Sequence, residues 1–298
     1  MEYSLKKINN EIIKPVKVDH IPIQNIKGWQ IIPVLFFVLY VIGKKGSGKT
    51  NIINHVIKNK IDKNTKVIVF GTTHNSCEVW KKIKKKLEKN NIENEFYNSI
   101  VDGKTNYLDN LLKTFQENDA LEQQKIKDEL QNNKEVKEEY TPLVDVEVLK
   151  YKKKKKYVKL KIGKKLITPK YLIIFDDISH QLKTKDVSDL IKTLRHFKCA
   201  VIVSSQYPND LELQARTQVD VECIFKGFDQ EKIEEIFPQL NLPMLNKKEF
   251  YALYYNITKN SDDHKDGNKN KNNYIYIDRN NEELRKNFNQ KIILAKKN

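Results

Sequence analysis

Glycine is scarce in this chain, with 9 residues in 298. That scarcity excludes glycine-rich low-complexity and collagen-like architectures, and it makes each glycine cluster informative. Cysteine is also rare: the three cysteines show no paired spacing, which fits a reducing compartment better than a disulfide-stabilised secreted fold. The N-terminal sequence MEYSLKKINN lacks the apolar core of a secretory signal. We therefore expect a protein that is not secreted.

A long apolar run is missing as well. The most membrane-like segment, Ile31–Ile42, has only twelve residues and contains Pro33, whereas a membrane-spanning helix needs about 20 apolar residues. Its β-branched and aromatic composition instead predicts a buried strand. The sequence therefore predicts no membrane partner.

Arginine is the scarcest charged residue. Lysine makes up 51 of the 55 basic residues, and the four arginines are Arg195, Arg216, Arg279 and Arg285. Lysine suffices for solvated positive charge, so each arginine is a candidate for a site that needs a planar, bidentate group. The net charge of +16 predicts a polyanionic partner, with nucleic acid favoured over an acidic membrane.

Three of the nine glycines lie in residues 41–50. This segment reads VIGKKGSGKT and matches the phosphate-binding pattern G-x-x-x-x-G-K-[ST]. Glycines let successive backbone N–H groups point at phosphate oxygens, and the following helix N-terminus adds its positive dipole end. Lys49 would reach the β- and γ-phosphates, and the Thr50 hydroxyl would bind Mg²⁺. The predicted phosphate cradle consists of Gly43, Lys44, Lys45, Gly46, Ser47, Gly48, Lys49 and Thr50. The sequence therefore predicts nucleoside triphosphate binding.

Two further apolar strands end in polar side chains. YLIIF at 171–175 runs into Asp176 and Asp177; a strand of this kind delivers a carboxylate to Mg²⁺, and the second acid can act as general base on water. The alternative is an Asp-Asp pair that caps the next segment. CAVIVSS at 199–205 leads to Gln206, which would sense the γ-phosphate or else lie in a surface loop.

The order of elements predicts an α/β fold with a mainly parallel sheet flanked by helices. We expect an N-terminal arm at 1–28 and one P-loop domain at 29–298, with a lysine-rich insertion at about 103–168 and a flexible loop at about 260–273. Helices are expected near 50–59, 78–90, 108–139, 186–195 and 230–237. Strands are expected at 31–42, 66–70, 171–175, 199–203, 221–225, 250–257 and 274–277.

The insertion carries most of the charge asymmetry. Residues 150–165 contain ten lysines and no acid, so the rest of the chain has a net charge of +6. Alternating valines at 144–148 and apolar residues at 158–162 predict a β-hairpin whose tip is Lys152–Lys156. The tip could contact phosphate backbones, act as a solvated tip that blocks edge pairing, or serve as a nuclear localisation signal.

The P-loop, FDD at 175–177 and LRHFKCAVIVSSQ at 194–206 together resemble the FtsK–HerA superfamily of DNA-pumping ATPases. Within it, the chain is most similar to the genome-packaging ATPases of poxviruses, giant DNA viruses and virophages. The resemblance implies a RecA-like core that binds ATP and Mg²⁺, with Asp176 on the metal, Asp177 acting on water, Gln206 as sensor and Arg195 as a finger reaching a neighbouring subunit. Its second acid is Asp where many relatives have Glu.

By the same resemblance, the function is an ATPase that translocates double-stranded DNA into a preformed capsid as a homo-oligomeric ring of five or six subunits. A capsid vertex protein is a further implied partner, and the implied location is the virion or the viral factory in the host cytoplasm, with the nucleus as alternative. The competing functions are a helicase or HerA-type DNA pump, a nucleotide-switched DNA-binding scaffold, and a small-substrate phosphotransferase.

Overall fold

The computed structural model describes residues 21–132, 152–153, 156–157, 166–259 and 273–294. Its centre is a nine-stranded sheet in the order β13-β12-β11-β10-β1-β9-β8-β2-β3. These strands are β1 (Val38–Ile42), β2 (Lys66–Gly71), β3 (Asn94–Tyr97), β8 (Tyr171–Asp176), β9 (Cys199–Ser205), β10 (Val221–Phe225), β11 (Tyr274–Asp278), β12 (Glu283–Lys286) and β13 (Gln290–Lys291). The strands from β10 to β3 pair in parallel, and β11 to β13 extend the sheet antiparallel.

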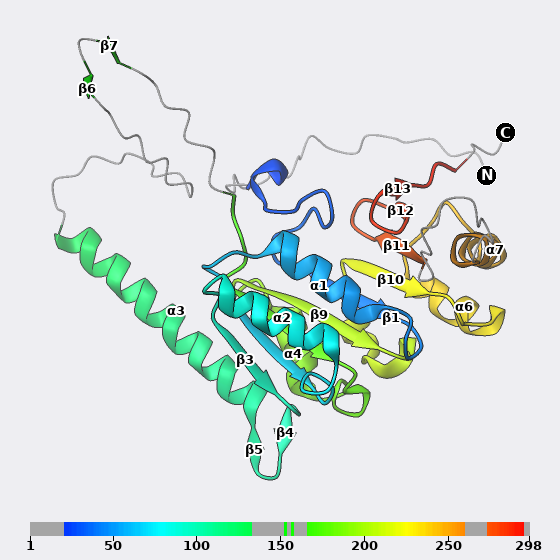
Figure 1. Cartoon of the computed structure of the whole chain (residues 1–298), viewed down its shortest axis with the longest axis horizontal. Coiled ribbons are helices and arrows are strands. Elements are labelled where there is room, and N and C mark those ends of the chain that lie inside the picture. The colour runs from blue at the N-terminus through cyan, green and yellow to red at the C-terminus, as the bar shows by residue number, and fades with distance from the viewer. Residues whose placement is uncertain (1–20, 133–151, 154–155, 158–165, 260–272, 295–298) are drawn as a thin grey trace, which may run out of the picture.

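Helices cover both faces of the sheet, as Figure 1 shows. The buried side chains of α1 (Lys49–Lys60) and α2 (Glu78–Lys89) pack on one face. The other face is covered by α3 (Tyr107–Asn132), α4 (Lys185–Thr193), α5 (Leu213–Arg216), α6 (Gln230–Ile236) and α7 (Lys247–Thr258). Short 3-10 turns lie at Ile23–Asn25, Ser179–Gln181, Pro208–Asp210 and Phe237–Gln239. The predicted three-layer α/β architecture is therefore confirmed.

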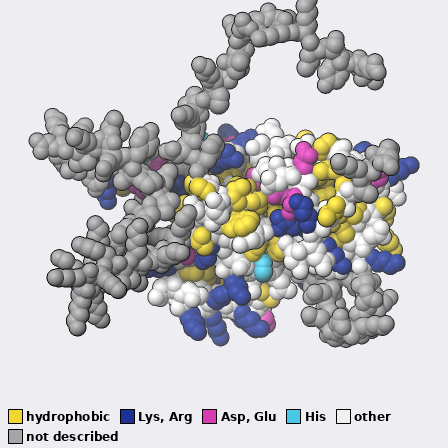
Figure 2. Space-filling view, turned by 90° about the horizontal axis from the view of Figure 1, so that it is seen from above, with side chains coloured by type: hydrophobic (Ala, Val, Ile, Leu, Met, Phe, Trp, Pro, Cys, Tyr) yellow, Lys and Arg dark blue, Asp and Glu magenta, His cyan; other side chains and the backbone are white. Residues whose placement is uncertain are grey.

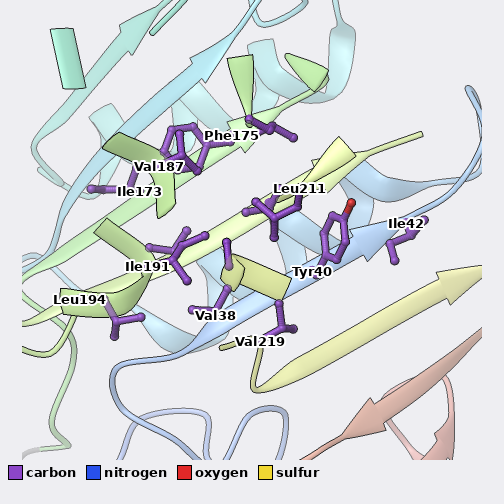
Figure 3. Close-up of a cluster of buried hydrophobic side chains, with 14 of the residues drawn as sticks. Val38, Tyr40, Ile42, Ile173, Phe175, Val187, Ile191, Leu194, Leu211 and Val219 are labelled. Atoms are coloured by element: carbon purple, nitrogen blue, oxygen red, sulfur yellow. The ribbon is translucent and has the colours of Figure 1, made fainter. Parts of the chain in front are cut away.

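The central strands are buried on both sides, which explains their nearly continuous apolar sequences. In β1, Val38, Tyr40 and Ile42 face the layer of α4 and α5, while Leu39 and Val41 face α1. Figure 3 shows the first three side chains among those from β8 and α4. A strand with apolar neighbours on both faces holds its carboxyl end rigidly, and the functional residues follow such ends.

The first strand is shorter than the sequence predicts. The apolar run was expected to form a strand from residue 31, but β1 begins at Val38. Pro33 cannot donate to a strand ladder, and the carbonyl groups before β1 have another partner. The buried Lys60 ammonium donates to Ile32 O at 2.9 Å and Val34 O at 3.0 Å. These hydrogen bonds from Lys60, a residue of α1, replace the strand-to-strand hydrogen bonds that the two carbonyl groups would otherwise accept.

Lys60 should make the folding stability depend on pH. Burial lowers the pKa of Lys60 to about 7, so the unfolded chain binds more protons than the folded chain between about pH 7 and 10.5. Stability should therefore rise through this window. Between pH 7 and 9 the free energy of unfolding of the wild type should gain about 2 kcal/mol relative to Lys60→Met. Urea unfolding measures this, with the exposed Lys58→Met on the same helix as control; parallel profiles for wild type and Lys60→Met would contradict it.

One predicted strand is wrong: residues 250–257 form part of helix α7. Aromatic and β-branched side chains favoured a strand, but Phe250, Tyr254 and Ile257 recur at helical spacing and all face the core. The helix begins at a capping box in which Asn246 and Glu249 accept from each other's backbone N–H groups. The capping-box pattern from Asn246 to Glu249 is the feature of the sequence that could have predicted a helix here.

The insertion is partly described. Helix α3 confirms the predicted helix as far as residue 132, and it follows a small hairpin of β4 (Val101–Asp102) and β5 (Thr105–Asn106). Within the lysine run, β6 (Lys152–Lys153) pairs antiparallel with β7 (Lys156–Tyr157). The predicted flanking strands at 144–149 and 158–162, residues 1–20 of the arm and most of the loop at 260–273 lie outside the described residues. The domain boundaries remain predictions. Ile26, near the end of the expected arm, forms a β-bridge with Ile167, near the end of the expected insertion.

Candidate active site

The sheet topology brings the predicted motifs to one edge. Strand β9 lies between β1 and β8, with Ile42 beside Ser205 and Asp176 beside Ser204. Because parallel strands end at the same edge, the segments that follow them are neighbours. The P-loop follows β1, Asp177 follows β8 and Gln206 follows β9. Gln206 therefore follows the strand that lies beside β8, while its role as a sensor stays a prediction.

The P-loop needs its glycines for three separate reasons. Gly46 and Gly48 have φ angles of 77° and 104°, a region that side chains avoid. A Cβ on Gly43 would lie 2.5 Å from Ser47 Oγ and 2.9 Å from Phe225 Cβ. Gly48 is the N-cap of α1, so the first turn of that helix directs its free N–H groups at the loop. The backbone is thus shaped to receive an anion.

Lys49 is buried under this loop. Its Nζ donates to Gly43 O at 2.7 Å, and Lys44 O lies 3.5 Å away. Burial lowers the pKa of Lys49, while the charges of Asp177 and Asp176 partly oppose that shift. The ammonium is therefore held between the loop carbonyls and the two carboxylates, where the phosphates of a bound nucleotide would meet both.

Asp176 is buried at the end of β8 and has a partner that the sequence did not suggest. Trp80 Nε1, on α2, donates to Asp176 Oδ2 at 2.7 Å, and Trp80 is itself fully buried. Burial raises the pKa of Asp176, and the Trp80 hydrogen bond partly opposes that shift. On β2, a Cβ on Gly71 would lie 2.8 Å from Asp176 O, so the neighbouring strand needs glycine there. A buried tryptophan N–H requires an acceptor, and that need is the signal that could have revealed Trp80.

Asp177 and Gln206 are in direct contact. Gln206 Nε2 lies 3.0 Å from Asp177 Oδ1 and 3.3 Å from Oδ2. Asp177 leaves β8 with a φ of 58°, which turns its side chain away from the strand direction, and its N–H donates to Ser204 O at 3.1 Å. Left-handed backbone is costly for most side chains and is tolerated best by Asp and Asn. The sequence placed both residues at this edge, and the structure joins them.

A small polar cluster fixes the segment that carries Gln206. Tyr40 Oη and Ser205 Oγ are 2.9 Å apart, and Tyr40 Oη also donates to Pro208 O at 3.0 Å. Gly43 N–H donates to Ser205 O at 3.1 Å, which ties the P-loop to the same strand end. Sequence reasoning treated Tyr40 as an apolar strand residue and did not find this anchor.

The donor set fits a nucleotide-bound Mg²⁺ better than a metal held by protein alone. Thr50 in the first turn of α1 and Asp176 are oxygen donors of the kind that Mg²⁺ prefers. Ser47 Oγ is buried and has no hydrogen-bond partner among the described residues. Over the same described residues no three His, Cys, Asp or Glu side chains gather as a metal site. Mg²⁺ commonly takes one or two protein oxygens and completes its shell with phosphate and water.

The arginines do not join this edge. Arg195 is exposed at the carboxyl end of α4, just before β9 begins, and therefore lies at the opposite edge of the sheet from the P-loop. Arg279 is buried in an ion pair with Glu222, and Arg285 stacks on Tyr276. Arg216 donates to Asn209 Oδ1 at 2.8 Å. Arg195 is the exposed one of the four, and it lies too far from the P-loop to enter the active site of the same chain.

Comparison with known families settles the relationship of the chain. The model of a family described as "Poxvirus A32 protein" matches residues 130–295, which is more than half of the 298 residues. The chain belongs to the poxvirus A32 protein family. The matched range contains Asp176, Asp177, Arg195 and Gln206, whereas the P-loop precedes it. The resemblance to poxvirus genome-packaging ATPases predicted from the motifs is confirmed at the level of the family. No curated protein matches this A32-family chain.

Several solved structures are similar to this A32-family protein at low identity. The genome packaging NTPase B204 from Sulfolobus turreted icosahedral virus 2, in complex with AMP, is 14% identical with a TM-score of 0.47 and covers 88% of this chain and 100% of its own. The same NTPase with ATP-gammaS is 14% identical with a TM-score of 0.45, and it covers 85% of this chain and 98% of its own. The N-terminal domain of zonular occludens toxin from Neisseria meningitidis is 15% identical with a TM-score of 0.32, and it covers 65% of this chain and 78% of its own. These scores add nothing to the fold that the structure itself shows.

Proposed function

We propose that the protein is an ATPase that drives double-stranded DNA into a preformed viral capsid. The observation that carries the proposal is the convergence of the P-loop, Asp176, Asp177 and Gln206 at one sheet edge. Membership of the poxvirus A32 family supports the packaging role. The net charge of +16 supports a polyanionic partner. Among the described residues no helix is long and apolar enough to cross a bilayer.

In this proposal each side chain has one task. Lys49 leaves the loop carbonyls and neutralises the β- and γ-phosphates. Thr50 and Asp176 would hold Mg²⁺, which would supply positive charge against the charge that develops during transfer. Asp177 accepts a proton from the attacking water. Gln206, which now contacts Asp177, would release that carboxylate when it meets the γ-phosphate.

The Arg195 position supports a ring of identical subunits. An exposed arginine at the edge opposite the P-loop has no task in its own active site, but it can enter a neighbour's site when subunits pack head to tail. The alternative to a role in a neighbour's site is that Arg195 stabilises its own chain. A cation at a helix carboxyl end interacts with the helix dipole, and the Arg195 charge also acts on the half-buried Asp220.

A mixing experiment separates these roles. Arg195→Ala and Lys49→Ala subunits should each be inactive alone, because an arginine finger contributes about 10³–10⁵ to rate in other P-loop systems. Mixed rings would contain some interfaces with an intact finger and an intact P-loop. ATPase activity should therefore partly recover on mixing. Normal hydrolysis by Arg195→Ala alone at saturating DNA would contradict the finger and make the half-buried Arg216 or the buried Arg279 the next candidate.

Triplex displacement tests translocation. A short third strand bound on a long duplex should be displaced in the presence of ATP and Mg²⁺, while the duplex itself stays paired. Displacement that depends on Lys49 would support the pump. Strand separation without a preference for intact duplex would indicate a helicase, and ATP-dependent DNA binding without displacement would indicate a nucleotide-switched scaffold.

A further inference from the structure

Helix α2 carries a row of lysines that the active site does not use. The helix has six lysines in twelve residues, EVWKKIKKKLEK. Lys82, Lys85 and Lys89 are exposed at i, i+3 and i+7, so they lie on one face. In Figure 1, α2 lies on the side nearest the viewer. Figure 2 shows the molecule from above, so that side forms its lower edge, where Lys and Arg side chains gather. This row is available to a partner.

The charges in this row are only partly offset from within. Across the described parts of the chain, Lys82, Lys85 and Lys89 form no ion pair. Glu78 pairs with Lys81 at 2.7 Å, and the charges of Lys82 and Lys85 act on the same carboxylate. Lys84 points elsewhere, since its Nζ lies 2.9 Å from Asn75 Oδ1 and over the Phe96 ring. Three like charges along about 10 Å of helix repel one another unless a polyanion covers them.

The opposite face of the same helix reaches the active site. Trp80, Ile83 and Leu87 are buried against the sheet. Trp80 Nε1 donates to Asp176 Oδ2, the carboxylate assigned to Mg²⁺. One rigid helix of twelve residues therefore joins an exposed cationic row to a ligand of the catalytic metal.

We propose that the Lys82, Lys85 and Lys89 row of α2 binds the phosphate backbone of duplex DNA, and that Trp80 transmits this contact to Asp176. The inference rests on the proposed function, because it needs a DNA-dependent ATPase. Duplex DNA carries one charge per about 1.7 Å of its axis, so a row of this length meets several phosphates at once. Lysine contacts of this kind carry no sequence preference, as a packaging motor requires.

Salt-dependent DNA binding tests the contact. Each lost phosphate contact lowers the slope of log affinity against log salt by about 0.9. The triple Lys82→Gln, Lys85→Gln, Lys89→Gln variant should therefore lose about 2–3 units of slope with a long duplex of mixed sequence. The matched control removes three exposed lysines from α7 and its end, Lys247, Lys248 and Lys259, on the other side of the sheet. The control should keep the wild-type slope.

Trp80→Phe tests the transmission. It keeps an aromatic side chain and removes the N–H donor to Asp176. The variant should therefore bind DNA with the wild-type salt slope while the ratio of ATPase rates with and without DNA falls toward 1. A wild-type slope in the α2 lysine variant would overturn the DNA contact, and would leave an acidic protein as the partner of this row. A wild-type stimulation ratio in Trp80→Phe would overturn the transmission. A wild-type chain that hydrolyses ATP but binds no duplex DNA would overturn the proposed function together with the inference.

Discussion

Lys49→Ala is expected to lower ATP hydrolysis by at least about 10²–10³-fold, the range lost when one preorganised transition-state donor is removed. Among the described residues, the Lys49 ammonium donates hydrogen bonds to carbonyls of its own loop and interacts with Asp177 and Asp176 through charge, so its loss should leave the core packing intact. Removing a buried ammonium whose pKa burial already lowers should also cost little stability. Steady-state phosphate release at saturating ATP and Mg²⁺ measures the effect.

Lys58→Ala is the matched control, because Lys58 is an exposed lysine on the same helix. Its hydrolysis rate and its thermal midpoint should both equal those of the wild type. Thermal unfolding of Lys49→Ala should also remain close to the wild type, which separates a catalytic loss from misfolding. If a folded Lys49→Ala protein hydrolyses ATP at a near-normal rate, the assignment of the P-loop is wrong.

Asp177→Asn is expected to retain nucleotide binding and to lose about 10²–10⁴-fold in hydrolysis, the usual contribution of a general base. Asparagine is among the few residues that tolerate the left-handed backbone at this position, where φ is 58°. Its side-chain oxygen can still accept from Gln206 Nε2, so the local geometry should survive. The substitution removes the negative charge and the proton acceptor of Asp177.

Two measurements separate binding from chemistry in Asp177→Asn. Equilibrium binding of a fluorescent ATP analogue should match the wild type, while single-turnover hydrolysis should fail. Asp102→Asn, at an exposed aspartate of the β4–β5 hairpin, provides the control for the same chemical change. Normal single-turnover hydrolysis by Asp177→Asn would move the general base to another residue.

Local sequence patterns were sufficient to predict the elements that build the site. Nearly continuous apolar runs identified β8, β9 and β10 because a strand buried on both faces has few polar positions. Glu222 in β10 is an exception, and Arg279 pairs with it. Polar residues directly after those runs then identified Asp176, Asp177 and Gln206. The glycine spacing identified the loop because φ angles such as that of Gly48 need glycine.

Contacts between segments far apart in the chain could not be predicted in the same way. Trp80 and Asp176 are 96 residues apart, and no local pattern links them. Lys60 shortened β1 by binding carbonyls 26 and 28 residues earlier. Helix α7 was misjudged for a different reason, since tertiary packing of its aromatic face outweighed β propensity. Whether Arg195 acts in a neighbouring subunit remains a prediction, because a trans contact needs a second chain.

The central claim is that this A32-family chain hydrolyses ATP and that duplex DNA accelerates the hydrolysis. The most direct measurement is the ATPase rate with and without long duplex DNA at two salt concentrations. We expect Lys49-dependent hydrolysis that rises with DNA at low salt, and a smaller rise at high salt because the phosphate contacts weaken. A rate that is the same with and without DNA at both salt concentrations, or no hydrolysis under any of these conditions, would contradict the account.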